Sequence, residues 1–389
     1  MNNKERNTLA ITGLSHLLVH AVMLILPAIL LVLQKHFGVG LATLGMIATA
    51  NQFMFGIGAI PSGILEKKLG GRTLILLYQF GVIFSIIVII LSKSLWVLTV
   101  GLMLLGLFSS IYHPAGLTII SRRIEAISKG MAFHGIMGSI GLAAGPIIGA
   151  GLTALNGWKC PYLVLGIVFV ILAVATIIVI PSRKREPEAT DHIQPEQTNR
   201  KVLLLYYGTI ILMGLAFAGF TTFMPAHFAM ETRNIFSTLS DTLRGGLFTT
   251  LVLLSGIIGQ FLGGILGEKY NKPKTLLLVL LTNIPLLILI GFTNGILLVM
   301  FGILLGVTHF VWQPVGNSLI AQITHSEHRG IGYGISFFLS FGIGAFAAGI
   351  GGVIAENYGI SSIFPVMAIF LLLGILLVVP IIKILAKDN

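Results

Sequence analysis

The feature that most constrains this sequence is a series of apolar stretches of about 20 residues that recurs along the whole chain. A stretch of that length, wound as an α-helix, crosses about 30 Å of hydrocarbon. Within lipid every backbone N–H and C=O group needs an internal partner, and a helix provides one for nearly all of them. Short alternating strands, the pattern of a membrane barrel, are not visible. The sequence therefore predicts an all-α, polytopic membrane protein.

Charged residues are too scarce for a soluble surface of this size. Asp, Glu, Lys and Arg make up 10% of the 389 residues, whereas soluble domains carry about a quarter. The 47 glycines are typical of transmembrane helices that pack closely. The single cysteine, Cys160, excludes an intramolecular disulfide and a cysteine-based metal site. The short polar N-terminus leads directly into a full-length apolar stretch, so we expect no cleavable signal peptide.

The apolar stretches predict twelve transmembrane helices, so both termini would lie on one side of the membrane. Their predicted bounds are 9–33, 41–65, 72–91, 95–121, 130–155, 161–180, 202–229, 245–267, 274–293, 295–323, 330–355 and 360–383. Of the 24 Lys and Arg, 19 lie on the side of the termini. The positive-inside rule then predicts cytoplasmic termini and a bacterial inner-membrane protein. The net charge of +11 is explained by this topology, and we expect no nucleic-acid partner.

The chain divides into two related halves, 1–181 and 202–389. Between them lies a polar, charged segment, 182–201, which we interpret as a flexible cytoplasmic linker. The segment LGLFSSIYHPAGLTIIS (105–121) aligns without a gap with LGVTHFVWQPVGNSLIA (305–321). A parallel repeat of two six-helix bundles is the arrangement of major-facilitator transporters, whose substrate site lies near mid-membrane between the bundles.

Three motifs carry a resemblance to the major facilitator superfamily. The segment GILEKKLGGR (63–72) resembles its signature between helices 2 and 3, with Glu66 where an Asp is usual, and Glu268-Lys269 begins a weaker copy. The spacing of Gly141, Gly145, Pro146 and Gly149 resembles the motif of drug/proton antiporters. The resemblance covers essentially the whole chain. It implies a monomeric secondary transporter that moves a small organic solute by alternating access, with proton-coupled efflux as the leading expectation.

A finer resemblance links the chain to the fosmidomycin-resistance group of these transporters. It rests on Ser15-His16 with Pro27, on Tyr112-His113-Pro114, and on residues 130–149. Members of that group carry an Asp close to the position of His20. This chain departs from the group there, so the acid that would couple transport to protons is replaced by an imidazole.

Histidines are the ionisable side chains that fall inside the predicted spans, whereas the acidic residues fall at helix ends or in loops. Imidazole titrates near pH 6.5 when unperturbed, and an ionisable residue within a span is by default a functional candidate. His16 and His20 share one face of the first helix. We expect His20 to carry the coupling proton, with His113 as the second candidate.

The resemblance implies that helices 1, 4, 7 and 10 line a central cavity. The residues predicted to form the substrate and proton pathway are His16, His20, Asn51, Gln52, Tyr112, His113, His134, Phe223, Gln260, His309, Trp312, Gln313 and Asn317. His309, Gln313 and Asn317 recur every four residues and would form one stripe. A packing role remains open for several of these residues, above all His134 and Phe223.

Two further groups of residues are predicted to control conformational change. Glu66, Lys67, Lys68, Arg72, Glu268 and Lys269 would form a cytoplasmic ionic latch, or serve only as topology anchors. The glycines of the helix 5 motif form a small-residue stripe that lets another helix approach closely, and Pro146 bends that helix. We interpret this motif as a conformational hinge at the contact between the two halves.

Alternative functions remain to be weighed against an exporter. Imidazole suits several transition metals, but no carboxylate ligand or zincin glutamate accompanies the histidines, so a metal ion or metal chelate is the alternative cargo. An uncoupled facilitator and a channel are further alternatives. No nucleotide-binding or hydrolytic motif is visible, so we expect neither an enzyme nor a cofactor. The partners that we expect are a small-molecule substrate, protons and the lipid bilayer.

Overall fold

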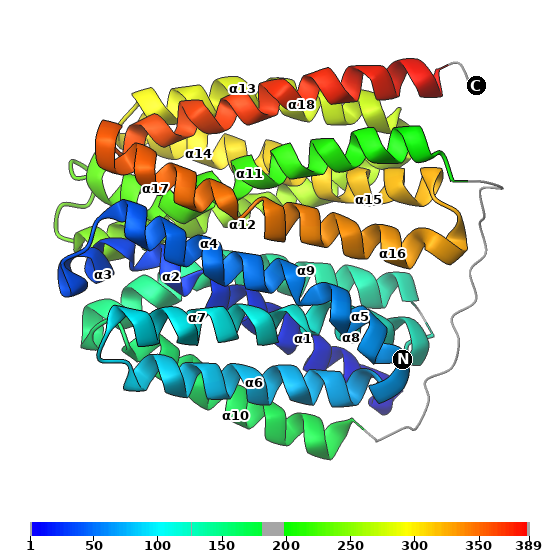
Figure 1. The fold of residues 1–389 in the computed structure, drawn as a ribbon, viewed down its shortest axis with the longest axis horizontal. Helices are drawn as coiled ribbons and strands as arrows, with labels where there is room; N and C mark the ends of the chain where they lie inside the picture. Colours follow the sequence, from blue (N-terminus) through cyan, green and yellow to red (C-terminus); the bar gives the residue numbers. More distant parts are fainter. Residues whose placement is uncertain (1, 126, 181–197, 387–389) are drawn as a thin grey trace.

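The computed structural model describes residues 2–125, 127–180 and 198–386, apart from the side chains of residues 66, 67, 127, 128 and 326–330. These residues form helices joined by short turns, and no strand occurs among them. Twelve helical segments are long and apolar enough to cross a membrane, which confirms the prediction from the sequence. The helices run side by side along the long axis of the molecule, and both termini lie at the same end (Figure 1).

The N-terminal half contains ten helices that make up six spans. They are α1 (Asn3–Met23), α2 (Ile25–Ala28), α3 (Leu30–Phe37), α4 (Leu41–Ile57), α5 (Ala59–Leu69), α6 (Gly71–Leu91), α7 (Leu95–Ser110), α8 (Tyr112–Arg123), α9 (Ile127–Asn156) and α10 (Cys160–Val179). The C-terminal half contains α11 (Arg200–Glu231), α12 (Asp241–Lys269), α13 (Lys272–Phe292), α14 (Gly295–Phe310), α15 (Trp312–Ile323), α16 (Ser326–Phe337), η1 (Phe338–Ile343), α17 (Phe346–Tyr358), η2 (Ile360–Ser362) and α18 (Ile363–Leu385).

Several predicted helices are interrupted, and proline explains most of the breaks. A proline has no N–H group to bond to the carbonyl four residues earlier. Pro114 therefore ends α7 at Ser110, and Pro314 ends α14 at Phe310, at equivalent positions of the two halves. The first span, predicted as one helix over 9–33, is instead divided into α1, α2 and α3 around Pro27. Pro146 lies inside α9, which stays continuous.

The predicted linker lies largely outside the described residues. Its last part is described, and α11 begins there, at Arg200 rather than at residue 202. The Asn199 side chain caps this helix by accepting a hydrogen bond from the backbone N–H of Val202. The backbone N–H of Asn199 also donates to the carbonyl of Ile323 at 2.9 Å, so the start of α11 is held against the end of α15.

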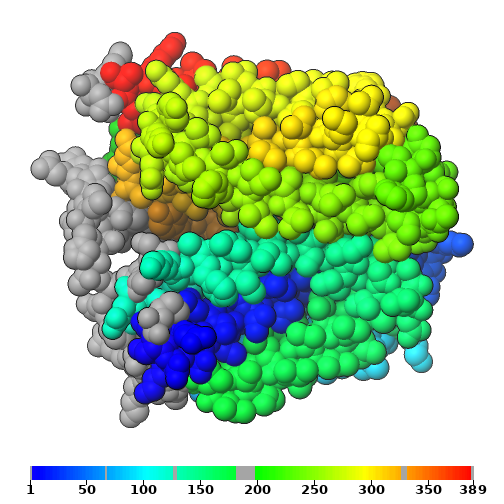
Figure 2. Space-filling view, turned by 180° about the vertical axis from the view of Figure 1, so that it is seen from behind, coloured from blue at the N-terminus to red at the C-terminus, as the bar shows by residue number. Residues whose placement is uncertain are grey.

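The two six-helix halves lie one above the other, with α9 and α12 side by side along the boundary (Figure 2). A second contact joins α4 to α17. There the Thr49 hydroxyl donates to the Ala345 carbonyl at 2.9 Å and accepts from the Gly349 N–H at 2.9 Å. At the end of α4 farther from the linker, the Glu356 carboxylate accepts from the Ala42 N–H at 2.9 Å.

Large apolar side chains are exposed along the outer helices, as expected of a surface that faces lipid rather than water. A soluble protein rarely exposes apolar patches of this extent. The most exposed examples include Ile178 on α10, Phe261 on α12, Phe292 on α13 and Leu376 on α18. The interior is also apolar, and one cluster of buried side chains continues through both halves. This distribution agrees with a helical bundle embedded in a bilayer.

Candidate functional site

Helix α1 presents two histidines to the interior of the N-terminal half. His16 and His20 are four residues apart, on one face of the helix, and are 8% and 9% exposed. His16 Nδ1 lies 2.7 Å from the backbone carbonyl of His134. A carbonyl oxygen only accepts, so Nδ1 carries the proton and Nε2 of the neutral ring has a free lone pair. His20 Nε2 lies 3.1 Å from that lone pair and donates to it.

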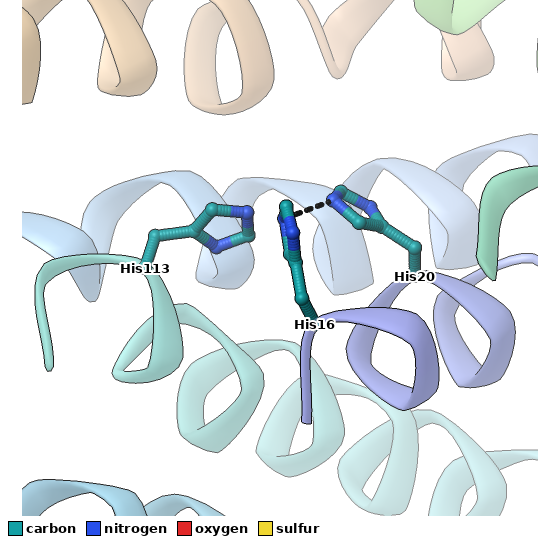
Figure 3. Close-up of side chains that lie close together, drawn as sticks. All are labelled: His16, His20 and His113. Atoms are coloured by element: carbon teal, nitrogen blue, oxygen red, sulfur yellow. Dashed lines mark hydrogen bonds between the residues drawn. The ribbon is translucent and has the colours of Figure 1, made fainter. Parts of the chain in front are cut away.

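Helix α8 brings the third histidine to the same point. His113 is the second residue of α8, directly after the break between α7 and α8. Its ring centre lies 5.1 Å from that of His16 and 5.2 Å from that of His20. Its Nδ1 atom is buried and has no hydrogen-bond partner. The three rings point toward one another from α1 and α8 (Figure 3).

Helix α9 supports this group from behind. The His134 ring is stacked on His16, with the ring centres 3.8 Å apart and the planes inclined by 10°. The Tyr112 hydroxyl donates to the backbone carbonyl of Thr12. It therefore accepts a hydrogen bond from His134 Nδ1, which lies 3.2 Å away. The absence of a side chain at Gly138 makes room for the His16 ring, because a Cβ atom there would lie 2.3 Å from it.

We call His16, His20 and His113 the histidine cluster. Its three imidazoles carry no negative charge and offer ring nitrogens as ligands. One ring nitrogen from each residue lies within 4.8 Å of the others. Every carboxylate whose position is described lies at or beyond a helix end: Glu5, Glu125, Glu231, Asp241, Glu268 and Glu356. Such a cluster can bind a cation through its lone pairs, or donate hydrogen bonds to an anion when its rings are protonated.

The residues of the predicted stripe along helix 10 lie in different surroundings. His309 is buried in α14, where its Nδ1 lies 3.2 Å from Asn283 Nδ2. Gln313 and Asn317 lie beyond the break, on α15, and are exposed. The three residues thus differ in burial, and a shared place for them on the substrate pathway stays a prediction. Gln313 Oε1 accepts from Gln260 Nε2 at 3.2 Å, so these two predicted residues do lie together.

The remaining pathway candidates lie in different surroundings. The Gln52 side chain is 3.5 Å from the Thr222 hydroxyl on α11, across the two halves. Asn51 is buried against Gly106, and its side-chain oxygen has no partner. Phe223 is fully buried against Gly351, so in this conformation it packs helices and does not face a substrate pathway.

The predicted latch is described only in part. The side chains of Glu66 and Lys67 lie outside the described residues. Arg72 donates to the carbonyl of Ile177 at 3.1 Å, which fixes it to α10 of its own half. Lys68, Glu268 and Lys269 are exposed. A latch between the halves therefore stays a prediction.

The helix 5 glycines contact a different partner from the one predicted. Gly141 and Gly145 face the α1 segment, where a Cβ atom at Gly141 would lie 2.2 Å from the Leu17 carbonyl, and Gly149 faces Ile25 and Ala28 of α2. They therefore hold the first span and α9 together inside one half. Another face of α9 meets the other half: the Ala143 carbonyl accepts from the Thr250 hydroxyl at 2.7 Å. The small-residue pattern identified a close approach but not which helix makes it.

Some polar residues were missed from the sequence. His227 on α11 is buried and lies 2.9 Å from the carbonyl of Ile290, and Asn283 on α13 holds His309. Both are isolated polar residues within apolar stretches, which is the signal that could have found them. The contact of Glu356 with the start of α4 had no local signal, because the partners are far apart in the sequence.

Comparison with known proteins identifies the family. The model of the Major Facilitator Superfamily matches residues 11–243 and again residues 232–388. The chain therefore belongs to this superfamily, whose members are transporters. It is 24% identical over 408 residues to the Fosmidomycin resistance protein of Escherichia coli (strain K12), a match that covers 96% of this chain and 93% of that protein.

Further similarities agree with this assignment. The chain is 27% identical over 275 residues to a Probable sugar efflux transporter of Helicobacter acinonychis (strain Sheeba), which covers 69% of this chain and 67% of that one. Its fold matches that of a bacterial homolog of the human lysosomal transporter Spinster, solved in an inward-facing and occupied conformation. The TM-score is 0.83, with 12% identity over 100% of this chain and 99% of the other.

Proposed function

We propose that this protein exports a small organic solute across the bacterial cytoplasmic membrane by alternating access, driven by inward proton movement. The family and fold are those of transporters. The full-length relative from Escherichia coli is named for drug resistance, and the partial relatives are named for sugar efflux. The second name states efflux, and efflux is one way to confer drug resistance, so the two names favour efflux over uptake.

The contacts between the two halves suit an interface that opens and closes. Between α4 and α17 small residues such as Gly45, Ala348 and Gly352 meet, and among the described residues the side-chain bonds between these helices come from Thr49 and Glu356. A Cβ atom at Gly45 would lie 2.4 Å from the Ala348 carbonyl, so the two backbones nearly touch. The bonds made by Thr49 and Glu356 are partly exposed, so water can replace them when the halves separate. Alternating access needs a boundary of this kind.

The observation that carries the proposal is the group of buried imidazoles inside the membrane spans. The described carboxylates, in contrast, all lie at the ends of helices or beyond them. Export against a concentration gradient by a chain without a nucleotide-binding motif requires a coupled ion. The assignment of that step to His20, with His113 second, stays a prediction from the sequence. The corresponding alternative is an uncoupled facilitator.

Transport by the purified protein in proteoliposomes tests the proposal. Fosmidomycin and a panel of sugars are suitable first solutes, since the names of the relatives suggest both. A carrier shows saturable counterflow, whereas a channel shows flux that rises linearly with concentration. A proton-coupled exporter concentrates its solute when a pH gradient is imposed and stops when an ionophore collapses that gradient. If the solute only equilibrates across the membrane and the ionophore has no effect, the protein is an uncoupled facilitator.

Orientation can be tested in the same system. The distribution of Lys and Arg supports cytoplasmic termini and a cytoplasmic linker. A protease should cut between residues 186 and 196 in inside-out vesicles and leave right-side-out vesicles intact. Cleavage only in right-side-out vesicles would reverse the proposed orientation.

A further inference from the structure

We propose that His16, His20 and His113 bind one divalent transition-metal ion of the zinc type, which arrives as a complex with an anionic chelator. This inference rests on the proposed function, because it names the class of solute that the transporter carries. The three residues come from two helices and converge on one point in the middle of the N-terminal half (Figure 3). Hydrogen bonds account for His16 and His20, but none accounts for the His113 Nδ1 atom, which faces them without a partner.

The distances suit a shared metal ion. Zinc binds histidine nitrogen at about 2.0–2.1 Å, so two neighbouring ligand nitrogens lie about 2.9 Å apart on a six-coordinate ion and about 3.3 Å apart on a tetrahedral one. The Nε2 atoms of His16 and His20 are already 3.1 Å apart, and metal binding would replace their hydrogen bond, with the His20 ring proton on Nδ1 instead of Nε2. The three ligand atoms lie within 4.8 Å of one another, so only the third nitrogen has to approach by about 1.5 Å. Rotation of the His113 side chain can supply that movement without a shift of the backbone.

A group beside the cluster holds the His16 ring in the orientation that a metal ligand needs. A metal-binding histidine usually donates its other ring N–H to a carbonyl or carboxylate, which directs its lone pair at the ion. His16 does this through the His134 carbonyl at 2.7 Å. His113 contributes a buried nitrogen that has no partner at all. A buried polar atom without a partner is costly, and a bound ion would satisfy it.

The charge balance determines the form of the cargo. Three neutral imidazoles add no negative charge, and an uncompensated divalent ion in a low-dielectric interior is strongly disfavoured. The described acid nearest in sequence on the same helix, Glu5, is 11 residues from His16, or about 16 Å along α1. Its carboxylate is already occupied by the backbone N–H groups of Asn2 and Glu125. The ion must therefore bring its own anionic ligands, which also fill the remaining coordination positions.

Direct binding measurements on the full-length protein in nanodiscs test this inference. The probes are Zn²⁺ alone and its neutral complex with iminodiacetate, which leaves coordination positions open for imidazoles. We expect one zinc complex per chain. His20→Gln and His113→Gln, which keep hydrogen-bonding capacity and similar volume, should each weaken binding at least about tenfold. The matched control is His227→Gln, which changes a buried histidine outside the cluster and should alter affinity less than about twofold.

The possible outcomes separate this inference from the proposed function. Chromatographic homogeneity and thermal unfolding establish that each variant is folded. Unchanged zinc binding in the doubly substituted His20→Gln/His113→Gln protein would overturn the site, as would absence of binding to the parent. Binding of free Zn²⁺ but not of the complex would overturn the proposal that the ion arrives bound to a chelator.

Counterflow of an organic solute by a parent protein that binds no zinc would reject this inference and leave the proposed function standing. Zinc binding without counterflow of any probe solute or zinc complex would reject the proposed function.

Discussion

The two halves of this transporter share a backbone plan but differ in the chemistry placed at equivalent positions. In the N-terminal half Tyr112 and His113 follow the proline-induced break, and in the C-terminal half Trp312 and Gln313 occupy the same places. His113 meets two further imidazoles and keeps an unpartnered nitrogen. Gln313 instead pairs with Gln260 at 3.2 Å. On our proposal, the duplicated fold supplies the frame that moves, and the cation site lies in the N-terminal half alone.

His309 sharpens this contrast, because it is buried more deeply than the cluster, and its ring neighbours among the described residues are phenylalanine and tryptophan. The Thr308 hydroxyl donates to Asn283 Oδ1 at 2.6 Å, which turns the Asn283 amide N–H group toward His309 Nδ1. Nδ1 then accepts, and the proton of the neutral ring lies on Nε2, which has no partner. The C-terminal half thus offers a buried hydrogen-bond donor, whereas the N-terminal half offers lone pairs. The donor in the C-terminal half would suit an anionic chelator, and the lone pairs in the N-terminal half would suit its metal ion.

The largest predicted effect comes from moving an imidazole from one half to the other. His113→Gln should lower the zinc affinity at least about tenfold. Adding Gln313→His to that variant should not restore it, because the other two ligands remain on α1. Isothermal titration with the zinc–iminodiacetate complex measures both variants. Restored affinity in the double variant would show that the cluster is not confined to the N-terminal half.

A smaller effect is expected from two glycines on α9 that differ only in what they face. Gly138→Ala would place a methyl group 2.3 Å from the His16 ring and push that ring out of position. Gly135→Ala meets nothing within 4 Å and serves as the matched control. We expect the zinc affinity to fall several-fold in the first variant and to stay unchanged in the second. Equal affinities would mean that the position of His16 does not matter to binding.

The sequence predicted the fold well but the site only in part. Length, apolarity and the internal repeat sufficed for twelve spans in two halves, because each helix satisfies its own backbone hydrogen bonds in lipid. The sequence also named every member of the histidine cluster. It could not show that His113 reaches His16 and His20, because the rotation of α8 relative to α1 is set by packing between helices. For the same reason it assigned the helix 5 glycines to the wrong contact.

The smallest predicted effect concerns Tyr112, which acts on the cluster through His134. Tyr112→Phe removes the acceptor for the His134 ring N–H and leaves the ring stacked on His16. We expect the zinc affinity to fall about two- to fivefold, less than on loss of a ligand. Trp312→Phe changes the equivalent residue of the other half and should leave zinc affinity unaltered. A loss as large as that of His113→Gln would instead place Tyr112 among the ligands.

X-ray absorption at the zinc edge, on the purified parent protein loaded with the zinc–iminodiacetate complex, tests the central claim most directly. The account predicts three imidazole nitrogens at about 2.0–2.1 Å from the ion, together with donors from the chelator. It also predicts that the imidazole signal falls by one ring in His113→Gln and remains complete in His227→Gln. A spectrum with no imidazole scattering, or one that does not change in His113→Gln, would contradict a metal site in the histidine cluster.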